Sequence, residues 1–296
     1  MKVSVVIPTF NCADLLGHTL RSIELGGWDD TEVIVIDGGS KDNIAEVVKS
    51  FGDLVSVFVS EPDEGQYDAI NKGMARATGE VLCWLNGGDY FLPGAIANAA
   101  TVFSTYESAQ WIIGRQCVGE GLALRRQGAH EVLVSHAEIQ YALCCGGVNG
   151  FLQQEGMFWR KSLWDDAGPL NTHYKLAADF ELWVRFAQIA ELDRMSVPMA
   201  AFSYHETNRS IVQRDAYFKE VEEVISKLPE DDKRFRDWIS WFPLVVRVVR
   251  KIPVVNWLAR LVMRQFRMLT FHVIFWKRTK KRGFVMCRQR RCAWIR

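Results

Sequence analysis

A short stretch between residues 81 and 92 joins an apolar run to a single carboxylate. Residues 81–85 are continuously apolar, as expected of a strand buried on both faces. The Asn-Gly-Gly sequence at 86–88 then removes side-chain bulk directly before Asp89. At the carboxyl end of a sheet strand, such a carboxylate can hold a divalent cation against a diphosphate, because hard cations prefer oxygen ligands. The plain alternative is a strand-to-turn corner with a solvated aspartate.

Small or acidic residues also follow the other predicted strands. They are Thr9, Asp37, and Glu61 with Asp63. Acids gathered at one edge of a sheet repel one another unless a cation or a donor-rich ligand meets them. The alternative explanation, without a functional role, is that Asp and Gly favour turns.

The positions of these residues are set by an alternating pattern of predicted strands and helices in the first 90 residues. Four apolar runs alternate with three amphipathic segments, which predicts an α/β fold with a parallel sheet and right-handed crossovers. The absence of a GxGxxG motif after the first run disfavours a Rossmann dinucleotide binder. The predicted strands are residues 3–7, 32–36, 55–59 and 81–85, and the helices lie near 15–23, 44–51 and 66–77.

The composition is that of a globular protein, with 49% hydrophobic and 24% charged residues in a chain of 296. Its seven cysteines are odd in number and lack CxxC spacing, which favours reduced thiols over a disulfide framework. The N-terminus does not resemble a signal peptide, and no run of about 18 apolar residues predicts a spanning helix. We therefore expect a cytoplasmic protein.

Charge is distributed unevenly along the chain. Residues 241–296 contain 15 of the 36 Lys and Arg residues and no Asp or Glu, which leaves residues 1–240 with a net charge of −14. Between residues 255 and 273, apolar and basic residues form separate helical stripes, which predicts a basic amphipathic helix lying on an anionic membrane surface. The alternative is a helix docked on the acidic body. Nucleic-acid binding is disfavoured, because the folded part is acidic and no recognition module accompanies the tail.

Five motifs, spread over roughly residues 1–215, closely resemble those of the family-two inverting glycosyltransferases of the GT-A fold, in particular bacterial transferases that build surface polysaccharides. They are PTFN (8–11), VIDGGSKDN (35–43), SEPDEGQYDAINKGMARATGEVLCWLNGGDYF (60–91), QEGMFWRKSLWDDAG (154–168) and LAADFELWVRFA (176–187). The resemblance implies a Rossmann-like, mostly parallel sheet flanked by helices, to which the C-terminal amphipathic extension is added.

The resemblance also implies a nucleotide-sugar pocket. Asp37 would accept a hydrogen bond from the base. For the residues on the predicted third helix, the alternative is a solvated helix start. The implied lining is Pro8, Thr9, Asn11, Asp37, Asp63, Asp68, Asn71, Lys72 and Asn86.

The metal motif departs from the family pattern. Asp89 matches its last acid, but Gly88 replaces the adjacent one, which makes metal affinity less certain. One carboxylate with diphosphate oxygens and water can still hold Mg²⁺ or Mn²⁺. His205 matches a family position able to touch the metal, and Arg209 could neutralise the diphosphate.

Two further motifs imply catalytic roles. Gln154 and Glu155 would bind hydroxyls of the acceptor or the donor sugar. Asp179 matches the general base, although an aspartate at a helix start is also explained as a cap. Inversion needs a carboxylate that takes the acceptor hydroxyl proton as the oxygen attacks the anomeric carbon.

The expected protein is therefore an inverting transferase that moves a sugar from a nucleoside-diphosphate sugar, favoured as UDP-linked, to a saccharide or lipid-linked acceptor at the cytoplasmic membrane face. We expect a catalytic domain at 1–215, a helical connector at 216–240 and a membrane-associating tail at 241–296. The alternatives are a sugar nucleotidyltransferase and a non-catalytic sugar-nucleotide-binding scaffold, the latter suggested by Gly88.

Overall fold

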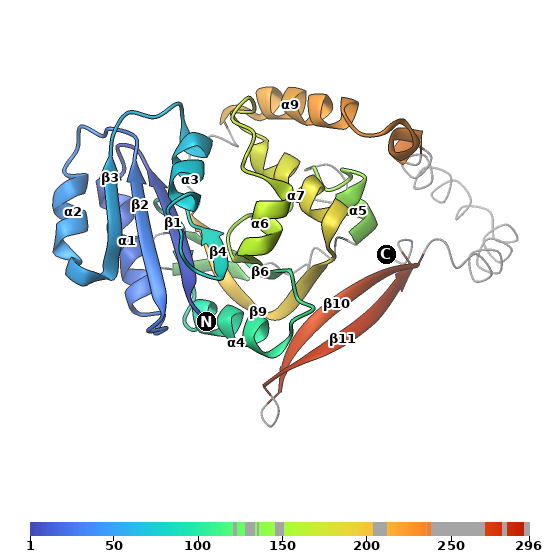
Figure 1. Ribbon diagram of the computed structural model, residues 1–296, viewed down its shortest axis with the longest axis horizontal. Helices are drawn as coiled ribbons and strands as arrows, with labels where there is room; N and C mark the ends of the chain where they lie inside the picture. The colour runs from blue at the N-terminus through green and yellow to red at the C-terminus, as the bar shows by residue number, and fades with distance from the viewer. Residues whose placement is uncertain are drawn as a thin grey trace, which may run out of the picture.

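The structure is a computed structural model that describes residues 1–120, 123–127, 134, 136–145, 151–203, 212–234, 236–237, 270–279 and 283–292. Its first half forms the predicted parallel sheet, with strands in the order β3-β2-β1-β4 (Figure 1). Every residue of β1 and β4 is buried, as their apolar runs predicted. The strands are β1 (Val3–Thr9), β2 (Thr31–Asp37), β3 (Val55–Ser60) and β4 (Val81–Trp84).

Helices connect these strands at the predicted places. They are α1 (Ala13–Glu24), α2 (Ile44–Ser50) and α3 (Gln66–Met74), with a short 3-10 turn η1 (Gly52–Leu54) before β3. Helix α3 packs closely on β1 at Gly73, where a Cβ atom would lie 2.3 Å from Cγ1 of Val6. This close packing places the first turn of α3 beside the carboxyl end of β1.

The second half of the chain continues the same sheet. β8 inserts antiparallel between β4 and β6, and β9 runs parallel to β6. The helices α6, α7 and α9 lie together on one side (Figure 1). The elements are β5 (Tyr90–Phe91), α4 (Ala95–Thr105), β6 (Trp111–Glu120), β7 (Ala123–Gln127), α5 (His136–Gln140), β8 (Met157–Arg160), α6 (Lys161–Ala167), α7 (Ala178–Ile189), β9 (Leu192–Ser203) and α9 (Arg214–Ser226).

The C-terminal region differs from the expected helix where the structure describes it. Strands β10 (Thr270–Thr279) and β11 (Gly283–Cys292) form an antiparallel hairpin, and β10 pairs with β9. The helix expected between residues 255 and 273 therefore cannot include residues 270–273, because they belong to β10. Its earlier part lies outside the described residues. The run FHVIFW in this segment is rich in β-branched and aromatic residues, which favour strands.

An aromatic cluster joins the sheet to α7. Trp84 of β4 stacks on Trp183 of α7 with ring centroids 5.4 Å apart and planes at 7°, and Trp159 of β8 meets both rings edge-on. All three indoles are at most 2% exposed. Trp84 precedes the Asp89 turn and Trp183 lies one helical turn after Asp179, so this cluster joins the two elements that carry the acids.

No helix in the described part of the chain is long and apolar enough to cross a membrane. The cysteines whose side chains are described are free thiols: Cys12, Cys83, Cys117, Cys144 and Cys145.

Candidate active site

The turn after β4 presents Asp89 as a buried carboxylate that is 5% exposed. The Ser203 backbone N–H donates to its Oδ1 at 2.8 Å, and the Asn86 side-chain amide donates to its Oδ2 at 3.2 Å. Burial raises the pKa of Asp89 to about 7, although both hydrogen bonds favour the charged form. The turn itself requires glycine at position 88, whose φ of +113° is rarely adopted by other residues.

Gln154 and Glu155 face this turn from the segment before β8. They are 7% and 8% exposed, and the Gln154 amide donates to Glu155 Oε1 at 3.2 Å. Gln154 Oε1 and Glu155 Oε2 are buried and find no donor among the described residues. Burial, and then the charge of Asp89, raise the pKa of Glu155 well above its usual value. Among the described residues these two acceptors remain unsatisfied, which makes them candidates for binding a ligand.

The oxygen atoms around Asp89 suit a hard divalent cation. The described residues contain no group of three His, Cys, Asp or Glu side chains that could hold a metal alone. The predicted ligand His205 lies outside the described residues, and so does Arg209. Asp89 supplies one carboxylate next to the orphaned acceptors, and Mg²⁺ or Mn²⁺ completes such a set with diphosphate oxygens and water. The residues present therefore fit a divalent cation that is held jointly by Asp89 and by the diphosphate of a bound nucleotide.

Asp179 lies at the start of α7, but Ala177 occupies the N-cap position. Two donors reach its Oδ1: the Phe180 N–H at 2.8 Å and the Tyr67 hydroxyl at 3.2 Å. No donor in the described part of the chain is recorded on Oδ2. Burial raises the pKa of Asp179 to about 6, against these hydrogen bonds.

The two predicted acids share one site. The Asn86 side chain donates to Asp89 and accepts from the Gln66 amide at 2.6 Å. The next residue of α3, Tyr67, donates to Asp179 at 3.2 Å. Besides burial, the charges of both acids also raise the pKa of Glu155. The arrangement therefore brings together the carboxylates that the sequence placed 90 residues apart.

The predicted base-binding residues lie at the carboxyl ends of β1 and β2. Asp37 is fully buried, and its carboxylate accepts hydrogen bonds from Ser40 N at 3.0 Å, from the Ser40 hydroxyl, and from the Ser60 hydroxyl at 2.7 Å. These bonds hold the turn after β2. The partly buried Asp63 lies over this turn, and a Cβ atom on Gly38 would be 2.6 Å from its Oδ2.

The loop after β1 lies beside the Asp89 turn. Asn11 is exposed, and its side-chain oxygen accepts from Lys41 N at 2.9 Å. The Pro8 carbonyl accepts from Gly87 N at 3.4 Å. A Cβ atom on Gly87 would lie 3.4 Å from Cγ2 of the buried Thr9. These contacts join the nucleotide edge to the carboxylate site.

The predicted lining residues of α3 all contact the protein. Asp68 Oδ2 accepts from Glu64 N at 3.1 Å and pairs with Lys72 at 3.2 Å. The Asn71 side chain bonds reciprocally to the backbone of Leu170, at 2.8 and 2.9 Å. These residues brace the loop before α3 and tie α3 to the segment before α7.

Sequence reasoning missed three residues that build the site. Tyr67 donates to Asp179, the Gln66 amide donates to Asn86 at 2.6 Å, and Glu220 of α9 binds the backbone before α7. Gln66 and Tyr67 lie within the motif at residues 60–91, so the sequence offered a signal for their role. The sequence offered no such signal for Glu220, because it lies in a helix beyond the five motifs.

Comparison with known proteins assigns this architecture to a family. Residues 4–166 match the model of Glycosyl transferase family 2. A PGL/p-HBAD biosynthesis glycosyltransferase from Mycobacterium bovis is 25% identical over 284 residues, which cover 94% of this chain and 98% of that protein. The fold is similar to TarS of S. aureus, with a TM-score of 0.61, 18% identity and coverage of 90% of this chain but 44% of TarS.

A second similar structure contains both a nucleotide sugar and a metal. The mannosyltransferase PcManGT from Pyrobaculum calidifontis, in complex with GDP-Man and Mn²⁺, has a TM-score of 0.59 at 17% identity, covering 89% of this chain and 74% of its own. With the family match spanning more than half of the sequence, the chain belongs to glycosyltransferase family 2 and has the GT-A fold.

Proposed function

We propose that this glycosyltransferase inverts the anomeric centre as it moves a sugar from a nucleoside-diphosphate sugar, favoured as UDP-linked, to a hydroxyl of a saccharide or lipid-linked acceptor. The hydrogen bonding of the Asp179 carboxylate is the observation that supports this proposal most. The Tyr67 hydroxyl and the Phe180 N–H both bind Oδ1, so we assign Oδ2 to the acceptor hydroxyl.

In this proposal Asp179 is the general base. Its Oδ2 takes the acceptor proton while the acceptor oxygen attacks the anomeric carbon from the side opposite the leaving diphosphate. A pKa of about 6 suits the role, because the group is largely ionised at neutral pH and still basic. Glu155 and Gln154 would accept hydrogen bonds from sugar hydroxyls through their unsatisfied oxygens.

The donor diphosphate would lie against Asp89. A Mg²⁺ or Mn²⁺ ion bound there would stabilise the charge of the departing nucleoside diphosphate. Similar structures support this choice of ligands: TarS has been solved with UDP and with UDP-GlcNAc, and glucosyl-3-phosphoglycerate synthase of Mycobacterium tuberculosis with Mn²⁺ and UDP. We assign the nucleotide to the edge formed by Thr9, Asn11 and Asp63, with Asp37 holding that edge in shape.

The basic tail supports a location at a membrane. We propose that residues 241–296, with 15 basic and no acidic residues, hold the protein on the cytoplasmic face of the membrane, where lipid-linked acceptors are available. The relative named for PGL/p-HBAD biosynthesis supports a biosynthetic role in surface polysaccharide or glycolipid assembly.

A donor panel tests the proposed function. The melting temperature is measured with UDP-, GDP- and dTDP-sugars, each with Mn²⁺ and with EDTA, because a ligand that binds only the native state raises it. Release of the nucleoside diphosphate is then followed with candidate acceptors. We expect stabilisation by one nucleotide class and metal-dependent release. Binding without turnover under any metal would instead indicate a scaffold, and pyrophosphate release from a nucleoside triphosphate a nucleotidyltransferase.

A further inference from the structure

One glutamate binds the segment that leads into α7. The Glu220 carboxylate accepts hydrogen bonds from three consecutive backbone N–H groups: Lys175 N to Oε1 at 3.0 Å, and Leu176 N and Ala177 N to Oε2, both at 2.9 Å. Successive N–H groups that converge on one point form an anion-binding concavity. Here the anion is the protein's own side chain, supplied by α9 from more than 40 residues further along the chain.

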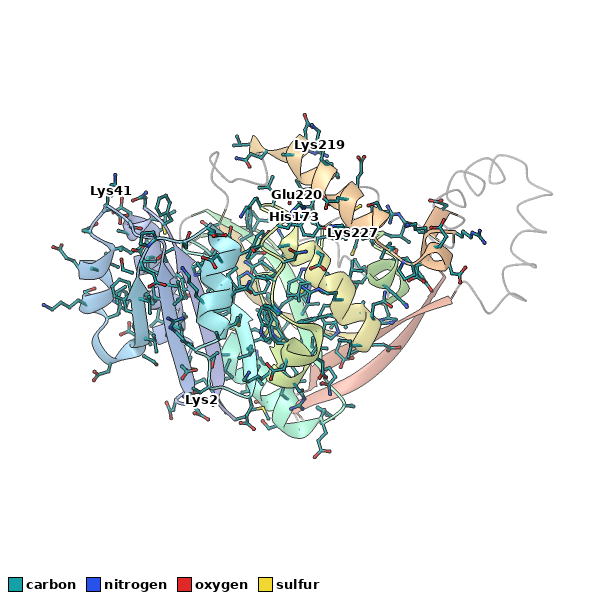
Figure 2. The ribbon with its side chains drawn as sticks, turned by 45° about the horizontal axis from the view of Figure 1, so that its top comes forward. Lys2, Lys41, His173, Lys219, Glu220 and Lys227 are labelled. Carbon is teal, nitrogen blue, oxygen red and sulfur yellow. The ribbon has the colours of Figure 1, made fainter. Side chains whose placement is uncertain are left out.

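The same face of α9 contacts the residues just before this segment. Glu223 pairs with His173 at 3.0 Å, and Lys227 donates to the Tyr174 hydroxyl at 3.0 Å. Glu220, Glu223 and Lys227 are spaced by three and four residues, so they project from one side of the helix. Figure 2 shows Glu220, His173 and Lys227 near one another along α9, whereas Lys219 points away from the body. Helix α9 is therefore seated on residues 173–177 by several separate contacts.

This contact determines where α7 begins. Ala177 is the N-cap residue of α7, and Asp179 follows two residues later. The helix start has no side-chain cap of its own. The Tyr67 hydroxyl of α3 also binds Asp179, at Oδ1. The carboxylate of Asp179 is thus held in two ways, directly by Tyr67 and through the backbone by Glu220.

We propose that Glu220 is a positioning residue for the general base, holding residues 175–177 so that Asp179 Oδ2 points at the acceptor. This inference rests on the proposed function, in which Asp179 is that base. It assigns a catalytic contribution to α9, which lies beyond the residues matched by the family model.

The negative charge of Glu220 allows a positioning role to be distinguished from simple stabilisation of the fold. The titratable groups that face Asp179 are Tyr67 from α3, Glu155 from the segment before β8, and Tyr217 and Glu220 from α9. The negative charge of Glu220 disfavours ionisation of Asp179. Removing that charge should lower the pKa of Asp179, which a loss of stability alone would not do.

The test uses the full-length protein and the substitution Glu220→Gln, with Glu222→Gln as the matched control on the exposed side of the same helix. Glutamine offers one acceptor oxygen, and its NH₂ group opposes the remaining backbone donors. We expect kcat to fall about 10- to 100-fold, because a small displacement of a catalytic group costs that much. Donor KM should stay within about twofold, since rate and binding are affected separately. The acid limb of the kcat profile, measured with saturating donor and metal, should move to lower pH.

Glu220→Asp keeps the charge but shortens the side chain, so we expect part of the loss in kcat and an unshifted acid limb. Backbone amide exchange provides a readout that needs no turnover: protection of the amides of residues 175–177 should fall in Glu220→Gln and not in Glu222→Gln.

Wild-type kcat and an unchanged pH profile in Glu220→Gln would overturn the inference, as would unchanged amide protection. If the wild-type protein itself transfers no sugar, the proposed function fails, and the exchange measurement still decides whether Glu220 holds the segment.

Discussion

At the scale of single residues, the site depends on two carboxylates in different surroundings. Asp89 accepts hydrogen bonds through both oxygens, whereas the Phe180 N–H and the Tyr67 hydroxyl, the donors to Asp179 in the described part of the chain, both bind Oδ1. Environments that differ in this way allow two acids to take different roles. The proposed division is that Asp89 serves the leaving diphosphate and Asp179 the incoming hydroxyl.

Replacing Asp179 by asparagine should remove transfer while preserving donor binding. The amide has nearly the same shape but cannot accept the acceptor proton, so we expect kcat to fall by about 10²- to 10⁴-fold. The donor-induced rise in melting temperature should match that of the wild type. Residual turnover close to the wild-type rate would exclude Asp179 as the base.

The pH dependence of kcat, measured with saturating donor and metal so that Asp89 is held ionised, should report the same group. Burial raises the pKa of Asp179 from 3.8 to about 6, and the base works only when ionised. Activity should therefore rise with pH through about 6 and fall roughly tenfold per unit below it. A profile that is flat from pH 5 to 7 would contradict this assignment.

Gly88 replaces an acid of the family's metal motif, and a substitution at this position tests the effect of that replacement. Gly88 has φ +113°, and a Cβ atom there would lie 3.4 Å from the Leu15 side chain. Gly88→Asp should therefore destabilise the fold by about 1–3 kcal/mol, measured by denaturant unfolding, instead of simply restoring a second metal ligand. Gly17→Ala is the control, because its Cβ has only one contact, at 4.0 Å, and lies inside a helix. Equal stability of the two variants would refute the argument.

At the scale of elements, the alternation of strands and helices in the first 91 residues was confirmed, because each element has its own periodicity and ends in turn residues. Four apolar residues of the motif at 154–168 are buried in the core: Phe158, Trp159, Leu163 and Trp164. The helix expected up to residue 273 was wrong at its end, where β10 begins. Short apolar runs do not distinguish a strand from a helix, and residues 270–273 are strand because they pair with β11 in the hairpin.

The aromatic cluster predicts a coupled loss of stability and activity. Trp183→Ala removes a fully buried indole that stacks on Trp84, so the free energy of unfolding should fall by about 3–5 kcal/mol. Under conditions where the variant remains folded, kcat should also fall, since Trp183 fixes α7 one turn after Asp179. Ile189→Ala, at the exposed end of the same helix, is the control. Loss of stability with unchanged kcat would show that the aromatic cluster does not position the active site.

At the scale of the whole molecule, an acidic body carries a basic C-terminal region that also completes the sheet. Because β10 pairs with β9, deleting residues after 240 would expose a strand edge as well as remove charge. The membrane proposal is better tested by neutralising Lys280, Lys281 and Arg282 to Gln. Each basic residue contributes on the order of 1 kcal/mol near an anionic surface, so co-sedimentation with phosphatidylserine vesicles should weaken markedly. Equal partitioning of both proteins would remove the membrane proposal.

The sequence by itself determined the α/β class, the parallel direction of the first strands and the acids at their ends, because periodicity and turn chemistry are local properties. The pocket roles of Asp37, Asn71 and Lys72 stay predictions, although the structure shows that each binds the protein.

Only the tertiary structure decided which groups meet Asp179. Tyr67 lies 112 residues away, and Glu220 acts through the backbone of residues 175–177. Contacts between distant segments depend on how helices pack over the sheet, and no local pattern in the chain encodes that packing.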